Sequence, residues 1–143
     1  MGENFYEAAI RHLTDGRILQ KEECYDNAVY LYGYAAECAL KSMITVYCGN
    51  ADGFLRRAYS HSGADILNDL YLFVVNESAA PMLDPALGMK LQKYVLPEVL
   101  FWAHPERRYL ANGQFDEGDA DACRGAAEFL VNEMVSQHID GYL

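Results

Sequence analysis

Hydrophobic residues recur every three or four positions along most of the chain, which is the spacing of the buried face of an α-helix. No stretch alternates between apolar and polar residues as a β-strand does, so we predict an all-α protein. The first helix is predicted from Asn4 to Gln20, with Asn4 as its N-cap and Glu7 at the third position. Gly16 in its middle predicts that a neighbouring backbone passes close by. The apolar stripe of this helix consists of Phe5, Ala8, Ala9, His12 and Leu13.

The second predicted helix, from Cys24 to Cys48, has two apolar sides instead of one, and it ends at Gly49-Asn50. One side consists of Ala28, Leu31, Tyr32, Ala35, Ala39, Met43 and Val46, and the other of Val29, Gly33, Ala36, Leu40, Ile44 and Tyr47. Such a helix lies in the centre of a bundle, or between a bundle and a second subunit. A narrow polar line remains between the two sides, formed by Asn27, Tyr30, Tyr34, Glu37, Lys41 and Thr45.

Further helices are predicted over residues 62–75, which open with a Ser-Gly-Ala-Asp capping box, and over a shorter stretch, 84–95, which opens with Asp-Pro. Pro97 breaks the helical pattern, and residues 103–115 form a long connection. The last helix is predicted over 116–138, with acidic residues in its first turn. We therefore predict an up-down antiparallel four-helix bundle, with an extra short helix and a long connection before the last helix, in a single domain spanning 1–143.

Composition narrows the range of functions. The net charge of −10 repels nucleic-acid phosphates on average, so a nucleotide or RNA contact requires a local basic patch or a partner chain. No apolar window is long enough to span a membrane, and the first residues lack the pattern of a secretory signal, which together predict a cytoplasmic protein. The cysteines lack metal-binding spacing, so we expect reduced, buried, structural thiols and neither a metal nor a cofactor. They are Cys24, Cys38, Cys48 and Cys123.

The segment 25–41, YDNAVYLYGYAAECALK, resembles the HEPN domain family, in which an aromatic residue and a Tyr-Ala-Ala-Glu-x-Ala-Leu-Lys stretch lie on the second helix. The segments 5–13, 61–70 and 102–109 resemble other parts of the same family. This resemblance implies a helical bundle, commonly a homodimer, that binds nucleotides or RNA or accompanies a nucleotidyltransferase partner. Other members are metal-independent RNases of toxin–antitoxin and phage-defence systems, which carry an arginine followed four to six residues later by a histidine.

Arg56 and His61 form the first candidate site, because their spacing matches that arginine–histidine pattern. A guanidinium there would neutralise a phosphate while an imidazole moves a proton. The pair lies between the second and third predicted helices, however, whereas the RNase pattern of the family belongs near the start of the last helix. We therefore favour a structural interpretation, in which His61 orders the turn before residue 62 and Arg56 lies on the surface.

Two further groups could bind a ligand. The first consists of Trp102, Arg107, Arg108 and Tyr109, with His104 nearby, and its guanidiniums and aromatic rings could hold a phosphate and stack a base. The alternative, which we favour, is that Trp102 plugs the end of the bundle while Arg108 pairs with a buried carboxylate such as Glu37. The second group consists of Tyr34, Glu37 and Lys41. Its Glu–Lys pair is either an ordinary helix ion pair or a partly desolvated polar anchor, and we favour the anchor.

These observations leave three hypotheses. The first is a dimeric HEPN module of a toxin–antitoxin or defence system that binds a nucleotide, RNA or a nucleotidyltransferase partner. The second is a metal-independent HEPN endoribonuclease that uses Arg56 and His61, or a variant site at Arg108. The third is a structural helical protein without a ligand. The first hypothesis is the one we favour, so we expect a binding function in preference to an enzymatic one.

Overall fold

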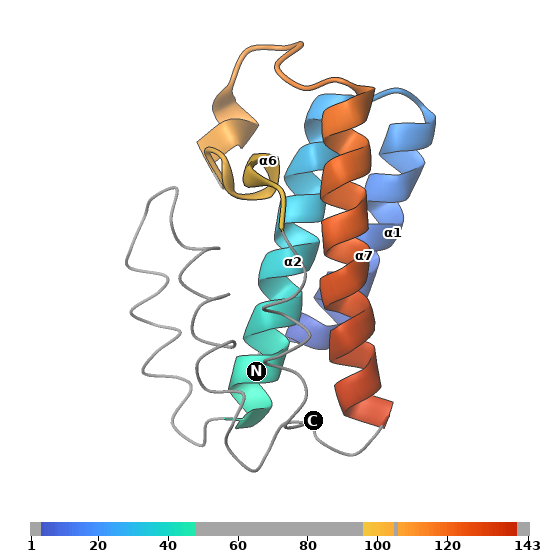
Figure 1. Ribbon diagram of the computed structural model, residues 1–143, viewed down its shortest axis with the longest axis vertical. Helices are drawn as coiled ribbons and strands as arrows, with labels where there is room; N and C mark the ends of the chain where they lie inside the picture. Colours follow the sequence, from blue (N-terminus) through green and yellow to red (C-terminus); the bar gives the residue numbers. More distant parts are fainter. Residues whose placement is uncertain (1–3, 48–95, 105, 140–143) are drawn as a thin grey trace.

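The computed structural model describes residues 4–47, 96–104 and 106–139, and this part of the chain contains helices and no strand (Figure 1). The prediction of an all-α fold is thereby confirmed for the described residues. The elements are the helices α1 (Phe5–Lys21), α2 (Tyr25–Tyr47), α6 (Glu98–Phe101) and α7 (Glu117–Ile139), and the 3-10 helix η1 (Glu106–Tyr109). The helices predicted over 62–75 and 84–95 lie outside the described residues.

Local hydrogen bonds explain where the described helices begin and end. The Asn4 side chain caps α1 by accepting a hydrogen bond from the backbone N–H of Glu7, with an N···O distance of 2.9 Å, as the sequence predicts. Asp116 and Asp119 cap the start of α7 reciprocally, since each carboxylate accepts from the backbone N–H of the other residue. Glu23, in the turn between α1 and α2, has a left-handed backbone conformation with φ of 62°. The predicted boundaries of these three helices therefore lie within one residue of the observed ones.

Helices α1, α2 and α7 pack side by side, and α2 contacts both of the others (Figure 1). The short turn between α1 and α2 makes these two helices antiparallel. The colour gradient in Figure 1 shows that α7 runs in the same direction as α2. These directions are those that an up-down bundle requires of its first, second and last helices.

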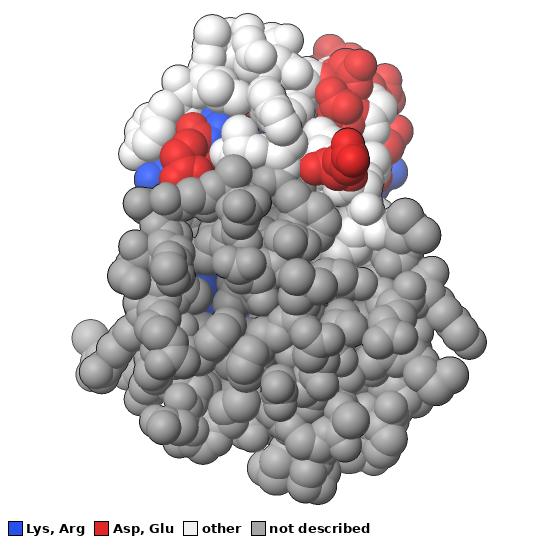
Figure 2. Space-filling view, turned by 60° about the vertical axis from the view of Figure 1, so that its left-hand side comes forward, with Lys and Arg blue, Asp and Glu red and all other residues white. Residues whose placement is uncertain are grey.

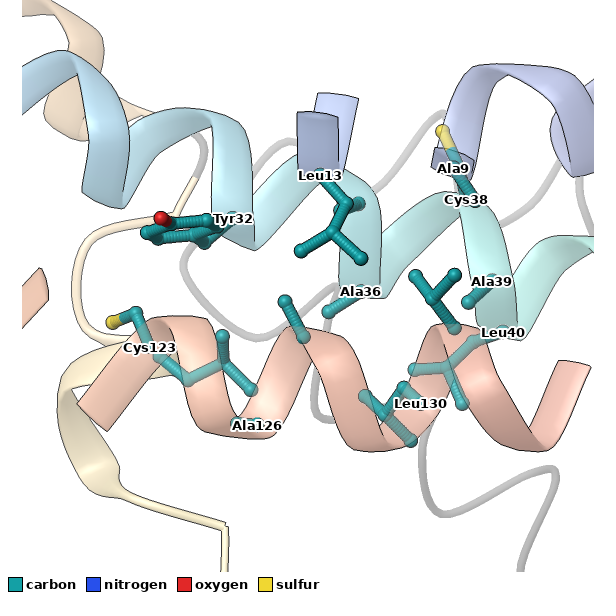
Figure 3. Packing of buried hydrophobic residues seen from close by; sticks show 14 of the residues in the cluster. Ala9, Leu13, Tyr32, Ala36, Cys38, Ala39, Leu40, Cys123, Ala126 and Leu130 are labelled. Atoms are coloured by element: carbon teal, nitrogen blue, oxygen red, sulfur yellow. The ribbon is translucent and has the colours of Figure 1, made fainter. Parts of the chain in front are cut away.

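The core lies where the three long helices meet, and it combines small and large side chains (Figure 3). Alanines such as Ala36 and Ala126 let the helices approach closely, while Leu13, Leu40 and Leu130 fill the space between them. Every residue of α2 from Ala35 to Met43 is buried. Of the two arrangements that the two-sided apolar pattern allowed, a central position within a single chain is therefore the one adopted.

A hydrogen-bond chain ties the three long helices together at one level. The Tyr32 hydroxyl on α2 donates to Gln20 Oε1 on α1 at 2.7 Å, and Gln20 Nε2 donates to Asp121 Oδ1 on α7 at 2.6 Å. The ring of Tyr32 lies directly over Gly16, where an added Cβ would be 2.7 Å from Tyr32 Cε1. The close approach predicted at Gly16 is thus made by an aromatic ring and not by a neighbouring backbone.

Candidate functional site

Glu37 sits at the centre of a buried polar cluster between α2 and the segment that follows α6. Its Oε2 accepts a hydrogen bond from Lys41 Nζ at 2.9 Å, and its Oε1 lies 3.0 Å from His104 Nε2. Lys41 is 1% exposed and His104 is fully buried. The polar line predicted on α2 is therefore enclosed at this level, and the Glu37–Lys41 pair is a buried anchor instead of a solvated helix ion pair.

Arg107 is buried beside this cluster and joins α2 to the α6–η1 segment, by which we mean residues 98–104 and 106–109. Its Nη1 donates to the carbonyl oxygens of Val99 at 2.7 Å and Trp102 at 3.2 Å. Its Nη2 donates to the carbonyl oxygen of Val29 on α2 at 3.0 Å. Two buried nitrogens nearby, His104 Nδ1 and Arg107 Nε, have no hydrogen-bond partner.

Burial and charge shift the ionisation of this cluster. Burial alone would raise the pKa of Glu37, but the hydrogen bond from His104 and the charge of Lys41 outweigh it and lower that pKa. Burial lowers the pKa of His104, although Glu37 acts in the opposite direction. Burial also lowers the pKa of Arg107 to about 10. At neutral pH we therefore infer an ionised Glu37 that accepts hydrogen bonds from Lys41 and from the Nε2–H of a neutral His104.

A second layer of aromatic and cationic side chains lies between this cluster and the solvent. The ring of Tyr34 contacts the ring of His104 edge-on, with centroids 5.2 Å apart, and contacts Tyr30 at 5.0 Å. The Arg108 guanidinium lies 4.6 Å from the centroid of the Tyr109 ring. We call Trp102, Arg108 and Tyr109, three exposed residues of the α6–η1 segment, the aromatic–guanidinium patch. Trp102 is 52% exposed and Tyr109 is 76% exposed.

The two ligand-binding groups suggested by the sequence thus form one two-layered arrangement. Tyr34 links them, because its ring contacts His104 below while the charge of Arg108 acts on its hydroxyl. Burial is the main reason that the pKa of Tyr34 is raised, followed by its hydrogen bond with Tyr30. The first candidate pair, Arg56 and His61, lies outside the described residues.

The buried arginine of this site is Arg107, whereas Arg108 is exposed. Among the described residues, the carboxylate of Glu37 is paired with Lys41 and His104. Trp102 is half exposed, and its ring packs in a T-shaped contact against the buried Phe115, with centroids 5.7 Å apart. It follows the single turn of α6 in an extended conformation.

Sequence reasoning placed His104 near the Trp102–Tyr109 group but did not connect it with Glu37, and it gave Gly33 no role at this site. Gly33 appeared only as a member of an apolar stripe, yet it is the point on α2 where the buried guanidinium approaches most closely. The single clue was a glycine inside a helix made otherwise of strongly helix-forming and aromatic residues, which implies a close neighbour. Nothing in the sequence could connect His104 with Glu37, because 67 positions separate them.

Metal chemistry finds no support in the described part of the chain, where no group of three or more His, Cys, Asp or Glu residues is placed to hold an ion. Cys38 and Cys123 are buried free thiols, and burial raises the pKa of Cys123 to about 12. Cys24 is exposed, which corrects the expectation that all the cysteines are buried. None of the described helices is both long and apolar enough to cross a membrane.

The two layers differ in what they can do chemically. The ion pairs and hydrogen bonds of the buried layer join the α6–η1 segment to α2. The patch above it offers flat aromatic rings and a guanidinium to an external molecule. Comparison of the chain with protein-family models, curated proteins and solved structures gives no match, so the assignment of a function depends on this geometry.

Proposed function

We propose that this chain is a HEPN-type binding module that holds an unpaired nucleotide, free or within RNA, at the aromatic–guanidinium patch. The observation that carries the proposal is the guanidinium of Arg108 stacked 4.6 Å from the centre of a Tyr109 ring that is 76% exposed. An exposed aromatic ring offers a flat surface on which an unpaired base can stack. Trp102, on the same short segment, offers a second exposed ring.

The charge of the protein favours stacking over phosphate binding as the main source of affinity. Figure 2 shows that the described upper part of the face on the α6 side is mostly uncharged, and that Asp and Glu cover more of it than Lys and Arg do. A duplex, which presents mainly phosphates, would be repelled by such a surface. An unpaired base instead stacks on an aromatic ring, which contributes about 1–3 kcal/mol per base whatever its identity. Arg108 then supplies a local positive charge for the attached phosphate.

Homodimerisation, a nucleotidyltransferase partner and a place in a toxin–antitoxin or defence system belong to the same proposal. They follow from the resemblance of segment 25–41 to the HEPN family. The burial of α2 within one chain means that a dimer would have to form through other surfaces. Sedimentation of the purified protein measures the dimer directly, and a gene for a nucleotidyltransferase next to this one would support the partner.

Trp102 provides the assay, because it is the only tryptophan in the sequence and lies within the patch. We expect a short single-stranded oligoadenylate RNA to quench its fluorescence in a saturable way, and the same sequence in a duplex to quench it much less. Tyr109→Leu keeps the apolar area but removes the stacking ring, and it should weaken binding about tenfold or more.

Arg108→Met should also weaken binding, whereas Arg124→Met is its matched control. Both substitutions remove one exposed arginine and change the net charge equally, but Arg124 lies on α7, where it pairs with Asp121 and Glu128. Equal losses in the two variants would show that only overall charge matters, and no quenching by any single-stranded RNA or nucleotide would refute the proposal. Cleavage of the RNA without added metal, abolished in His61→Ala, would instead support the endoribonuclease alternative.

A further inference from the structure

We propose that Gly33 and Arg107 are positioning residues for the aromatic–guanidinium patch: the buried guanidinium, seated over a helix position that has no side chain, holds the patch rigid before a ligand arrives. This inference rests on the proposed function, because a rigid patch matters only if the patch binds a ligand. Its test does not depend on that function, because the mobility of Trp102 can be measured without a ligand. It explains why an arginine is buried directly next to an exposed one. It also assigns a role to a glycine in the middle of the central helix.

The hydrogen bonds of Arg107 define both sides of the patch. Its Nη1 holds the Trp102 carbonyl at 3.2 Å, which fixes the backbone that carries the exposed indole. Its backbone N–H donates to the Ala103 carbonyl at 2.6 Å, and its own carbonyl accepts from Leu110 N at 3.1 Å, which closes the η1 turn around Arg108 and Tyr109. One residue therefore connects the tryptophan side of the patch with the arginine–tyrosine side.

The same guanidinium fastens this turn to α2. Its Nη2 donates to the Val29 carbonyl at 3.0 Å, so the planar fork bridges two separate segments with its two ends. The face of the Phe115 ring, whose centroid is 5.9 Å from the Arg107 guanidinium carbon, adds a cation–π contact before α7 begins. A lysine at position 107 would offer a single ammonium group, without the planar fork whose two ends reach two separate segments.

Position 33 has to be glycine for this arrangement to exist. A Cβ built there would overlap the Arg107 guanidinium and would lie 2.6 Å from His104 Nδ1. Contacts this short force the neighbouring groups to move, and here both neighbours are buried and held by other bonds. His104 is the second side chain that joins the α6–η1 segment to α2, because its Nε2 is bonded to Glu37 on that helix. A methyl group at position 33 would therefore push both Arg107 and His104 away from α2.

Rigidity matters because the rings of a flexible segment lose freedom when a ligand orders them, and that loss weakens binding. A patch already fixed on α2 avoids most of this cost. We therefore expect Gly33→Ala to act on Trp102 in the absence of any ligand. The exposed fraction of Trp102 is 52%, so complete release of the segment would raise its collisional quenching by acrylamide by about twofold.

The experiment compares Gly33→Ala and Arg107→Lys with two control variants. Gly118→Ala is the same change in a helix where the added Cβ would meet only Asp116 Oδ1, at 3.3 Å. Tyr32→Phe lowers the stability of the bundle without touching the α6–η1 segment, because its hydroxyl bonds to Gln20. Circular dichroism first verifies that each variant is helical under the conditions used. Acrylamide quenching of Trp102 and titration with the oligoadenylate RNA are then measured for all of them.

We expect Gly33→Ala and Arg107→Lys to quench more strongly than wild type and to bind the RNA about tenfold more weakly, while both controls match wild type in both measurements. If Trp102 quenching in Gly33→Ala equals that of wild type, or if Tyr32→Phe raises it as much, the positioning role is overturned. If quenching changes as expected but wild-type protein binds no RNA or nucleotide, the positioning role stands and the proposed function fails.

Discussion

The strength of the Glu37–Lys41 pair decides whether α2 carries a buried anchor or an ordinary helix ion pair. A double-mutant cycle with Glu37→Gln, Lys41→Met and the combined variant measures this strength directly. Glutamine is the appropriate replacement because it keeps an oxygen that accepts the hydrogen bond from His104. Each single substitution removes one half of this buried ion pair, and we expect each to lower the free energy of unfolding by about 3 kcal/mol.

The magnitude follows from the distance and the burial. At the observed N···O separation of 2.9 Å, with both side chains at most 7% exposed, the Coulomb attraction is about 6 kcal/mol at an effective dielectric constant of about 20. Desolvation of both ions opposes this attraction, so we expect a net coupling energy of about 2 kcal/mol. For a domain of this size, a loss of about 3 kcal/mol lowers the melting temperature by roughly 10 °C.

Urea unfolding followed by circular dichroism measures the four free energies of the cycle. The same chain offers an internal comparison in Arg124 and Glu128, a partly exposed pair with the same four-residue spacing and a 3.8 Å separation. Its cycle should give a coupling of about 0.5 kcal/mol or less. A coupling energy for Glu37 and Lys41 as small as that of the partly exposed pair would refute the idea that their burial makes the interaction strong.

Two other predictions concern ionisation and hydrogen bonding. His104 has a pKa below its ordinary 6.5 and Glu37 one below its ordinary 4.5, so for both groups the unfolded chain binds protons more readily than the folded one. The urea midpoint should therefore fall as pH drops below about 6.5, and fall further below about 4.5; a midpoint that stays constant from pH 7 to pH 4 would contradict both shifts. Tyr32→Phe removes the donor to Gln20, which is itself bonded to Asp121, and should cost about 1 kcal/mol of unfolding free energy in the same assay. Unchanged stability there would mean that the three-helix hydrogen-bond chain does not contribute to the fold.

Helices and their ends were predictable because the information is local. Asn4 and Asp116 are capping residues whose partners lie three positions away, so their role is visible in the sequence. The double apolar pattern of the second helix likewise predicted that it would be enclosed on both sides. The polar line on that helix was predicted for the same reason, since a period of three to four residues places its members on one edge.

The site was only partly predictable, because its contacts join distant parts of the chain. Arg107 and Arg108 are neighbours on an irregular connection, where no periodicity indicates which side chain turns inward. The register of the 3-10 turn selects Arg107, and its three carbonyl partners among the described residues become available only when this turn packs on α2. The exposure of Trp102 was likewise not predictable, because a large apolar residue by itself suggests burial. It is exposed because α6 ends after a single turn.

The amino-acid sequence by itself determined that this chain forms helices, where the three long described ones begin and end, and which of them occupies the centre; it did not indicate the short elements α6 and η1. These properties depend on propensities, caps and periodicity, all of which act over a few residues. Only the tertiary structure decided that a glycine on that central helix receives a guanidinium, and that a histidine 67 positions away completes the pairing of Glu37. Such contacts depend on which surfaces of the folded chain pack against each other, and packing between distant segments has no short-range pattern in the sequence.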